Sequence, residues 1–206
     1  QSVTGGSDNT YTLTNTYSSD KGMLKAKKLL YLEAGMLDGL EDGKATGFPS
    51  VTFEVYRRYK FKDGQGEVDS AWTKISSKTW SASDIKEKYQ TENANGNGAW
   101  LDSDDIFTFE NLDIYAPNGS QYQYQIKEVK TSEGAYNTWV KNEDILVSAA
   151  EETVTDEAAA ESEEINGKWY VSSDELSPQA GSESLNVSVT FLNKRPSKPE
   201  EVLQLT

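Results

Sequence analysis

The chain has 206 residues and a formal net charge of −14, and it contains neither cysteine nor histidine. These absences exclude disulfide bonds, zinc sites built on thiolate or imidazole, and protease triads that use a histidine base. The net charge argues against a nucleic acid partner, and no apolar run approaches the roughly 20 residues that span a bilayer. The first ten residues lack the layout of a signal peptide, so we expect any export signal to lie outside this sequence.

Six segments show the alternation of apolar and polar residues that predicts β-strands with one buried face. They are residues 22–34, 50–61, 105–112, 121–130, 167–173 and 184–195. Pairs of Asp or Asn with Gly mark turns between them, and residues 81–90 predict one short helix, with Ser81 and Asp84 at capping-box spacing. Short strands separated by turns predict an all-β fold, an antiparallel β-sandwich with at most short helices.

The two ends of the chain carry a similar motif. Residues 11–17 (YTLTNTY) and 189–195 (VTFLNKR) both run from alternating apolar residues into an Asn that polar residues follow. Both can simply be strand ends, or residues 1–17 can be the tail or last strand of a preceding repeat. The predicted organisation is then a linker at 18–21, one domain at 22–196 and a C-terminal linker at 197–206.

Acidic residues cluster in three places. Residues 143–164 hold nine acids and no base, which we interpret as a solvated excursion that is partly helical; an acidic ligand site is the alternative. The segments 63–69 (DGQGEVD) and 102–105 (DSDD) could bind calcium, although neither has EF-hand spacing, and DSDD could supply the paired carboxylates of a carbohydrase. Solvated turns explain both more simply, so we expect neither a metal site nor an enzyme active site there.

Polar residues occupy inward positions on three predicted strands. Glu128 follows apolar inward residues of strand 121–130, as Lys28 does in strand 22–34 and Asn193 in strand 184–195. Each alone has an ordinary explanation: a solvent-facing lysine, a carboxylate where a strand leaves the sheet, or an amide that caps a turn. Since a lone buried charge is costly, we expect the three side chains to converge, with the strands of Lys28 and Asn193 next to each other.

The sequences around these residues resemble the collagen-adhesin B-type (Cna B-type) domain of Gram-positive surface adhesins and pilins. The motifs are GMLKAKKLL (22–30), FTFENLDIYAPNGSQYQYQIKEV (107–129) and VSVTFLNKRP (187–196), of which the middle one is the most specific. The resemblance covers residues 22–196, with longer loops at 62–104 and 143–166. It implies an immunoglobulin-like sandwich that serves as a stalk or backbone domain on the cell wall, with the signal and the wall anchor outside this fragment.

The resemblance also implies a chemistry. Domains of this family form an intramolecular isopeptide bond between a Lys and an Asn with the help of an acid. Carried over by position, these are Lys28, Asn193 and the catalytic Glu128. Lys27 is the alternative amine, because a register shift of one residue decides which lysine faces inward. Asn15 would be the corresponding Asn of a preceding domain.

Burial explains how such a bond can form without an enzyme. An apolar core, in which we expect Tyr122, Tyr124 and Phe191, disfavours the charges of Lys28 and Glu128, so the amine becomes a neutral nucleophile. We expect protonated Glu128 to polarise the Asn193 carbonyl and to move protons until ammonia leaves. The reaction is a single turnover that requires no cofactor.

A ligand-binding adhesin module is the alternative function. The chain has five Trp and eleven Tyr residues, and long loops around Trp72, Trp80, Trp100 and Trp139 could recognise a host matrix protein or a glycan. We favour core packing for most of these aromatic residues. The expected partners are neighbouring tandem domains of the same chain, with neither nucleic acid nor membrane among them. A polymerising pilin and a monomeric adhesin are both compatible with the sequence.

Overall fold

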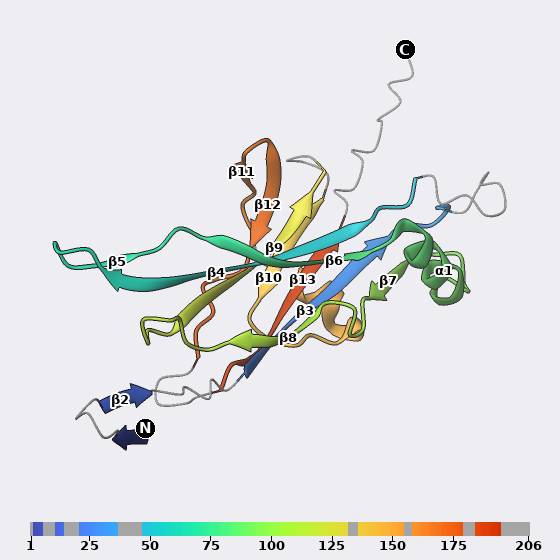
Figure 1. The fold of residues 1–206 in the computed structure, drawn as a ribbon. Helices are drawn as coiled ribbons and strands as arrows, with labels where there is room; N and C mark the ends of the chain where they lie inside the picture. The colour runs from blue at the N-terminus through green and yellow to red at the C-terminus, as the bar shows by residue number, and fades with distance from the viewer. Residues whose placement is uncertain are drawn as a thin grey trace, which may run out of the picture.

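Most of the chain forms two β-sheets, accompanied by short helices (Figure 1). The computed structural model describes residues 2–5, 11–14, 21–36, 47–131, 136–154, 158–178 and 184–194. The five-stranded sheet contains β3 (Lys21–Leu32), β7 (Ala99–Asp102), β8 (Thr108–Asp113), β10 (Asn137–Lys141) and β13 (Asn186–Lys194). The six-stranded sheet contains β4 (Val51–Lys62), β5 (Glu67–Asp69), β6 (Thr73–Trp80), β9 (Tyr122–Lys130), β11 (Glu163–Ile165) and β12 (Lys168–Ser172).

The strand order places β3 and β9 well inside their sheets. The five-stranded sheet has the order β10-β13-β3-β7, with β8 also paired to β3, and the six-stranded sheet has the order β11-β12-β9-β4-β5, with β6 also paired to β4. All predicted strands are present, so the prediction of a mostly β fold with two sheets and short helices is confirmed. The sequence analysis missed β1, β5, β6, β7, β10 and β11, which are short or largely polar.

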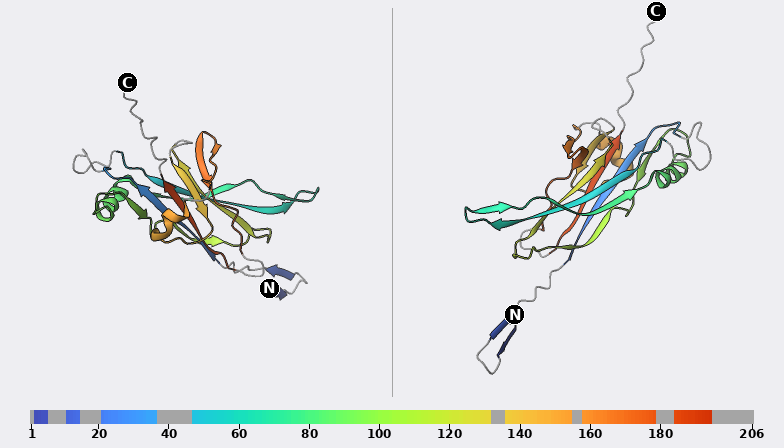
Figure 2. Two further views of the ribbon diagram at one scale, coloured as in Figure 1. Left: turned by 180° about the vertical axis from the view of Figure 1, so that it is seen from behind. Right: turned by 45° about the horizontal axis from the view of Figure 1, so that its top comes forward.

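The strands β3 and β13 lie side by side and run parallel (Figure 2), with Phe191 opposite Lys28. The prediction that the strands of Lys28 and Asn193 are neighbours is therefore confirmed, while the prediction of an antiparallel arrangement is wrong for this pair. The other pairs among the described strands are antiparallel. A tight hairpin forces antiparallel pairing, but most of the chain separates β3 from β13, so either direction is open to them.

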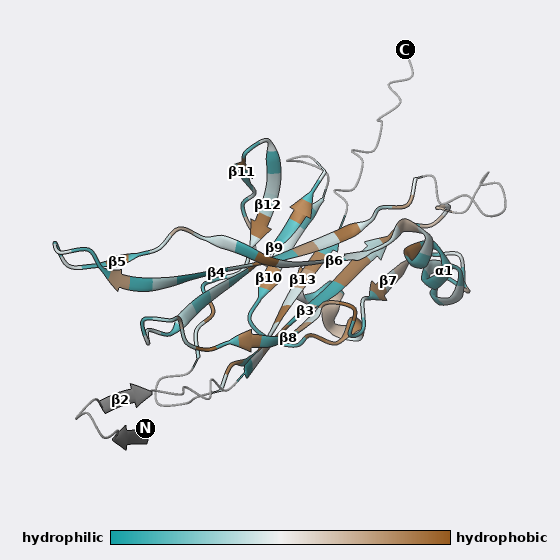
Figure 3. Cartoon of the chain, in the orientation of Figure 1, coloured by the Kyte–Doolittle hydropathy of each residue, from teal (hydrophilic) through white to brown (hydrophobic). Residues whose placement is uncertain are grey.

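The core lies between the two sheets and is built from the alternate residues of each strand that the sequence predicts to face inward. Leu24, Ala26 and Leu30 of β3 are fully buried, as are Phe53 and Val55 of β4. Figure 3 shows hydrophobic residues recurring along the strands where the sheets overlap. Alternation along each strand therefore selects the buried face, as the period-two pattern predicts.

Two glycines are required by the local backbone. At Gly22 a Cβ atom would lie 2.6 Å from the Cβ of Leu185, so only glycine permits this close approach beside β3. Gly167 follows Asn166 in the turn between β11 and β12, where both have positive φ, 78° and 52°. These angles fit the type I′ turn that an Asn-Gly pair predicts.

The predicted helix is present as α1 (Ala82–Glu92). Ser81 is its N-cap, and the Ser81 side chain accepts a hydrogen bond from the Asp84 backbone N–H at 3.2 Å, which confirms the predicted capping interaction. Ile85 and Tyr89 are the buried residues of this helix. No helix in the described part of the chain is long and apolar enough to cross a membrane.

The acidic stretch 143–164 is more than the solvated excursion that the sequence predicts. Its helical part among the described residues is limited to η1 (Val147–Ala149) and α2 (Ala150–Thr153). A second hydrophobic cluster joins apolar residues of this stretch to the outer face of the five-stranded sheet; it contains Leu29, Trp139, Ile145, Ala150, Val154 and Leu192. In addition, the Ala160 N–H donates to the Thr138 carbonyl of β10 at 2.7 Å. The stretch therefore packs against one sheet face and is hydrogen-bonded to the edge strand β10.

The N-terminal residues form a small sheet of their own. The strands β1 (Ser2–Gly5) and β2 (Tyr11–Thr14) pair with each other in antiparallel register and belong to neither of the larger sheets. Asn15, most of the predicted linker at 18–21 and the C-terminal segment 197–206 lie outside the described residues. The assignment of residues 1–17 to a preceding repeat stays a prediction.

Candidate functional site

Lys28 lies in the middle of β3, on the face that meets the other sheet. Its side chain is fully buried, and its backbone N–H donates to the Ser103 Oγ at 2.9 Å. Burial lowers the pKa of the Lys28 ammonium to about 8, although the neighbouring Glu128 carboxylate acts in the opposite direction, and the Lys130 cation lowers this pKa further. The lowered pKa makes the neutral amine more accessible near neutral pH than it is for a solvated lysine.

Glu128 occupies the facing position on β9 and contacts both other residues of the predicted trio. Its Oε2 accepts a hydrogen bond from the Lys28 Nζ at 2.7 Å, and its Oε1 accepts one from the Asn193 Nδ2 at 2.6 Å. Pairing with Phe53 of β4 and Val171 of β12 holds Glu128 in the interior of its sheet. One carboxylate thus bridges the two nitrogen atoms of the candidate site.

Asn193 lies near the end of β13 and is 3% exposed. Its Oδ1 atom is buried and has no hydrogen-bond partner in the described part of the chain. The sequence predicts that Glu128 contacts this carbonyl oxygen, whereas the structure places Glu128 beside Nδ2. A carboxylate only accepts hydrogen bonds, so it pairs with the N–H side of the amide. A proton taken up by Glu128 could therefore pass directly to Nδ2.

Aromatic rings form the apolar wall of the site. Phe191 is the strand partner of Lys28, and Phe53 is the strand partner of Glu128. The Phe53 ring contacts the rings of Phe191 and Phe107 edge-on, with both centroid distances at 4.7 Å. Tyr122 and Tyr124 belong to the same buried core as Phe191, as the sequence predicts. They lie farther along β9 from Glu128, with the Tyr122 ring against Tyr59 and the Tyr124 hydroxyl bonded to the Asp113 carbonyl.

The alternative amine, Lys27, points to the opposite face of β3. Its Nζ forms ion pairs with Asp102 at 3.3 Å and with Asp144 at 3.1 Å. Lys25 also lies away from Glu128, in an ion pair with Asp105 at 2.8 Å. Of the three neighbouring lysines, Lys28 is the one whose amine contacts Glu128.

The DSDD cluster is neutralised by lysines. Asp102 pairs with Lys27 and Asp105 with Lys25, as described, and Asp104 pairs with Lys88 at 2.7 Å. Within the described residues, no group of three or more acidic side chains is arranged to hold a metal ion. The contacts at 102–105 are thus those of an ion-paired loop.

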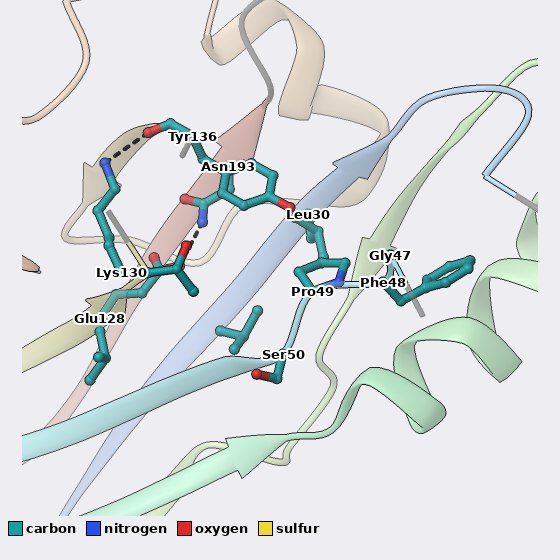
Figure 4. Close-up of a pocket in the computed structure, with 12 residues that line it drawn as sticks. Leu30, Gly47, Phe48, Pro49, Ser50, Glu128, Lys130, Tyr136 and Asn193 are labelled. Carbon is teal, nitrogen blue, oxygen red and sulfur yellow. Dashed lines mark hydrogen bonds between the residues drawn. The ribbon is translucent and has the colours of Figure 1, made fainter. Parts of the chain in front are cut away.

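A pocket of about 290 Å³ opens beside the candidate site (Figure 4). Glu128, Asn193 and Lys130 line it, together with Tyr136 and Phe48, whereas Lys28 is not among its lining residues. The Lys130 Nζ donates to the Tyr136 carbonyl oxygen at 2.8 Å and to the Ser162 Oγ at 2.9 Å. The sequence analysis missed Lys130, although its position two residues after Glu128 places both on the same strand face.

Comparison of the chain with protein-family models, with curated proteins and with solved structures finds no match.

Proposed function

We propose that this chain is a structural stalk or backbone domain of a Gram-positive cell-surface adhesin or pilus, stabilised by an autocatalytic isopeptide bond between the Lys28 Nζ and the Asn193 Cγ. The observation that carries the proposal is the buried Glu128 carboxylate, which is bonded to the nucleophilic nitrogen on one side and to the leaving nitrogen on the other. An ordinary buried ion pair does not require a carboxamide as a third member. In this arrangement amine, carboxamide and proton carrier are held together.

The geometry supports a proton relay through Glu128. Neutral Lys28 attacks the Asn193 carboxamide carbon, and as the Nζ–Cγ bond forms Glu128 takes a proton from Nζ. Glu128 then gives that proton to Nδ2, the Cγ–Nδ2 bond breaks, and ammonia leaves. An amine and a primary carboxamide thus become one secondary amide and one ammonia, and the Glu128 carboxylate is regenerated. The reaction happens once per chain, so the domain is not an enzyme.

Folding supplies the activation that an enzyme would otherwise provide. The side chains of Lys28 and Asn193 come from strands that pair directly, and Glu128 faces them from the other sheet. Holding reactants in this way can lower a barrier by about 7–11 kcal/mol. Reaction also removes a buried ammonium, whose unpaired form would cost several kcal/mol in an apolar core.

The resemblance to Cna B-type domains and the two-sheet architecture support an immunoglobulin-like sandwich in this proposal. Adjacent first and last strands are the arrangement that a crosslink between residues 28 and 193 requires. A chain without cysteine cannot use disulfide bonds, so an isopeptide bond would serve the same purpose on the cell surface. Tandem neighbours in the same chain are the proposed partners.

The contacts give less support to a ligand-binding function. Trp80 and Trp139 are buried, and Trp72, Trp100 and Trp169 are partly buried. Trp72 lies against the Arg58 guanidinium at 4.7 Å, and Trp100 against the Tyr31 ring at 5.4 Å. Four of the five tryptophans, Trp72, Trp80, Trp100 and Trp139, therefore pack against other residues of the domain, which favours the stalk over a glycan- or protein-binding module.

The intact mass of the purified chain tests the proposed bond. We expect a mass lower than the sequence mass by one ammonia, because crosslinking releases one ammonia and adds nothing. Digestion with trypsin should yield a branched peptide that joins the segments around Lys28 and Asn193. A wild-type chain of full mass would refute the bond, and a branch at Lys27 would retain the chemistry but change the amine.

Two variants control this measurement. Succinimide formation at an Asn-Gly pair, such as Asn118-Gly119, also releases ammonia, but it does not depend on Glu128. Glu128→Gln should therefore restore the full mass if the loss comes from the crosslink. Glu110→Gln, at an exposed position on β8, should keep the mass deficit.

Deletion of residues 1–17 is expected to leave the melting temperature nearly unchanged. The reason is that β1 and β2 pair only with each other among the described strands, while the core between the larger sheets begins at β3. Thermal unfolding of the shortened and full chains checks this. A decrease similar to that caused by loss of a core strand would instead make these residues part of this domain.

A further inference from the structure

Lys130 lies across the end of the sandwich next to the candidate site. Lys130 is the last residue of β9. Its ammonium donates a hydrogen bond to the backbone carbonyl of Tyr136, which lies just before β10 of the other sheet. Figure 4 shows this bond above Asn193 and Glu128, on one side of the pocket. The second bond, to Ser162, joins it to the residues that precede β11. Two hydrogen bonds, to two different segments of the chain, therefore hold the cation at the end of β9.

The fixed position matters because the Lys28 amine must lose its proton before it can attack. Glu128, which the Lys28 ammonium contacts at 2.7 Å, favours the charged form. Lys130 follows Glu128 by two residues on the same face of β9 and lines one pocket with Glu128 and Asn193, so its cation lies close enough to this group to disfavour a second positive charge on Lys28. The neighbouring Phe191 strand is uncharged at this position, and the Ser103 hydroxyl, also uncharged, bonds the Lys28 backbone N–H. Lys27 lies on the opposite face of β3, where it is paired with acids. A second cation near a buried amine favours its neutral form, and the effect is stronger where little water intervenes.

We propose that Lys130 is a positioning residue for the crosslinking reaction. Its ammonium, held by hydrogen bonds to Tyr136 and Ser162, favours the uncharged amine of Lys28. This inference rests on the proposed function and concerns only how fast the bond forms. Lys130 does not contact the reacting atoms in this role. It acts through Lys28, by offsetting part of the stabilisation that Glu128 gives to the ammonium.

The test is the pH dependence of the crosslinking rate in Lys130→Met and Lys130→Gln. Chains made by cell-free synthesis are isolated in denaturant, diluted into folding buffers of different pH, and followed by intact mass. We expect both variants to shift the midpoint of the rate profile upward by about half a pH unit or more, and to react about threefold or more slowly at pH 7. Gln keeps a hydrogen-bond donor, so an equal shift of the midpoint in Lys130→Gln and Lys130→Met would assign the effect to charge. Lys130→Arg should restore the wild-type midpoint.

A matched control is Lys127→Met, which removes a cation from the opposite face of the same strand, where Glu163 pairs with it at 2.6 Å. This variant should keep the wild-type midpoint. A lower rate at every pH with an unchanged midpoint in both Lys130 variants would show a structural role and overturn the proposal, as would unchanged rates. A wild-type chain that never loses ammonia would instead refute the proposed function, so the two failures are distinct.

Discussion

Replacement of Glu128 by Gln is expected to lower the melting temperature by about 10–20 °C. The crosslink would close residues 28–193 into a loop, which contributes about 5 kcal/mol in the chain-entropy model. A change of 1 kcal/mol moves the melting temperature of a domain of this size by roughly 2–4 °C. Without the Glu128 carboxylate the bond cannot form, and the whole contribution is lost. Protease resistance should decrease with it.

The single variant also leaves the Lys28 ammonium without its carboxylate, which is itself destabilising. The double variant Lys28→Met with Glu128→Gln removes both charges at similar volume. The difference between its melting temperature and that of the wild type therefore reports the crosslink more directly. Thermal unfolding and protease half-life, measured for wild type, both variants and Glu110→Gln, separate the two effects. If the double variant and the wild type had the same melting temperature, the crosslink would contribute nothing to stability.

The rate of crosslinking is expected to rise about tenfold per pH unit below pH 8 and to level off above it. The sign follows from the lowered pKa of Lys28, about 8. Below this pKa the ammonium predominates and cannot attack; above it, the amine is neutral and can attack. Folding of denatured chains at a series of pH values, with intact mass as the readout, checks the profile.

The opposite profile would change the assigned role of Glu128. A rate that is constant up to pH 8 and then falls would mean that the reactive state carries one more proton, held by Glu128. In that case Glu128 would act as an acid toward the Asn193 carbonyl, as the sequence analysis expects. The carboxamide would first have to rotate so that Oδ1, and not Nδ2, faces Glu128. The crosslink itself would stand in either case, because both routes release one ammonia.

The inward rows of the strands could be predicted well because burial alone selects them. Lys28, Glu128 and Asn193 each follow apolar residues at alternate positions, and the two-sheet fold brings these rows together. The parallel direction of β3 and β13 could not be predicted, since no turn links them. Nor could the orientation of the Asn193 amide, which depends on hydrogen-bond partners from another sheet.

Other parts of the fold were missed because their alternation is weak or their partners are distant in sequence. β6 is mostly polar and pairs with β4 along one edge of the sheet, so its pattern resembles a loop. In the acidic stretch, the charge concealed the apolar positions of Ile145, Ala150 and Val154, which pack on the outer sheet face. Lys130 was missed because its importance lies in contacts with residues 136 and 162 that no local pattern reveals.

The parallel pairing of β3 and β13 has a mechanical consequence if the domain is one link of a stalk. The chain enters at Lys21 and leaves at Lys194, and because the two strands point the same way these positions lie toward opposite ends of the sheet (Figure 1). Tension between neighbouring domains would then pull the two strands past each other along their length. A covalent link from Lys28 to Asn193 would carry that load directly from one strand to the other. Only residues 21–28 and 193–194 of the two strands would be stretched, and everything between 28 and 193 would bear no tension.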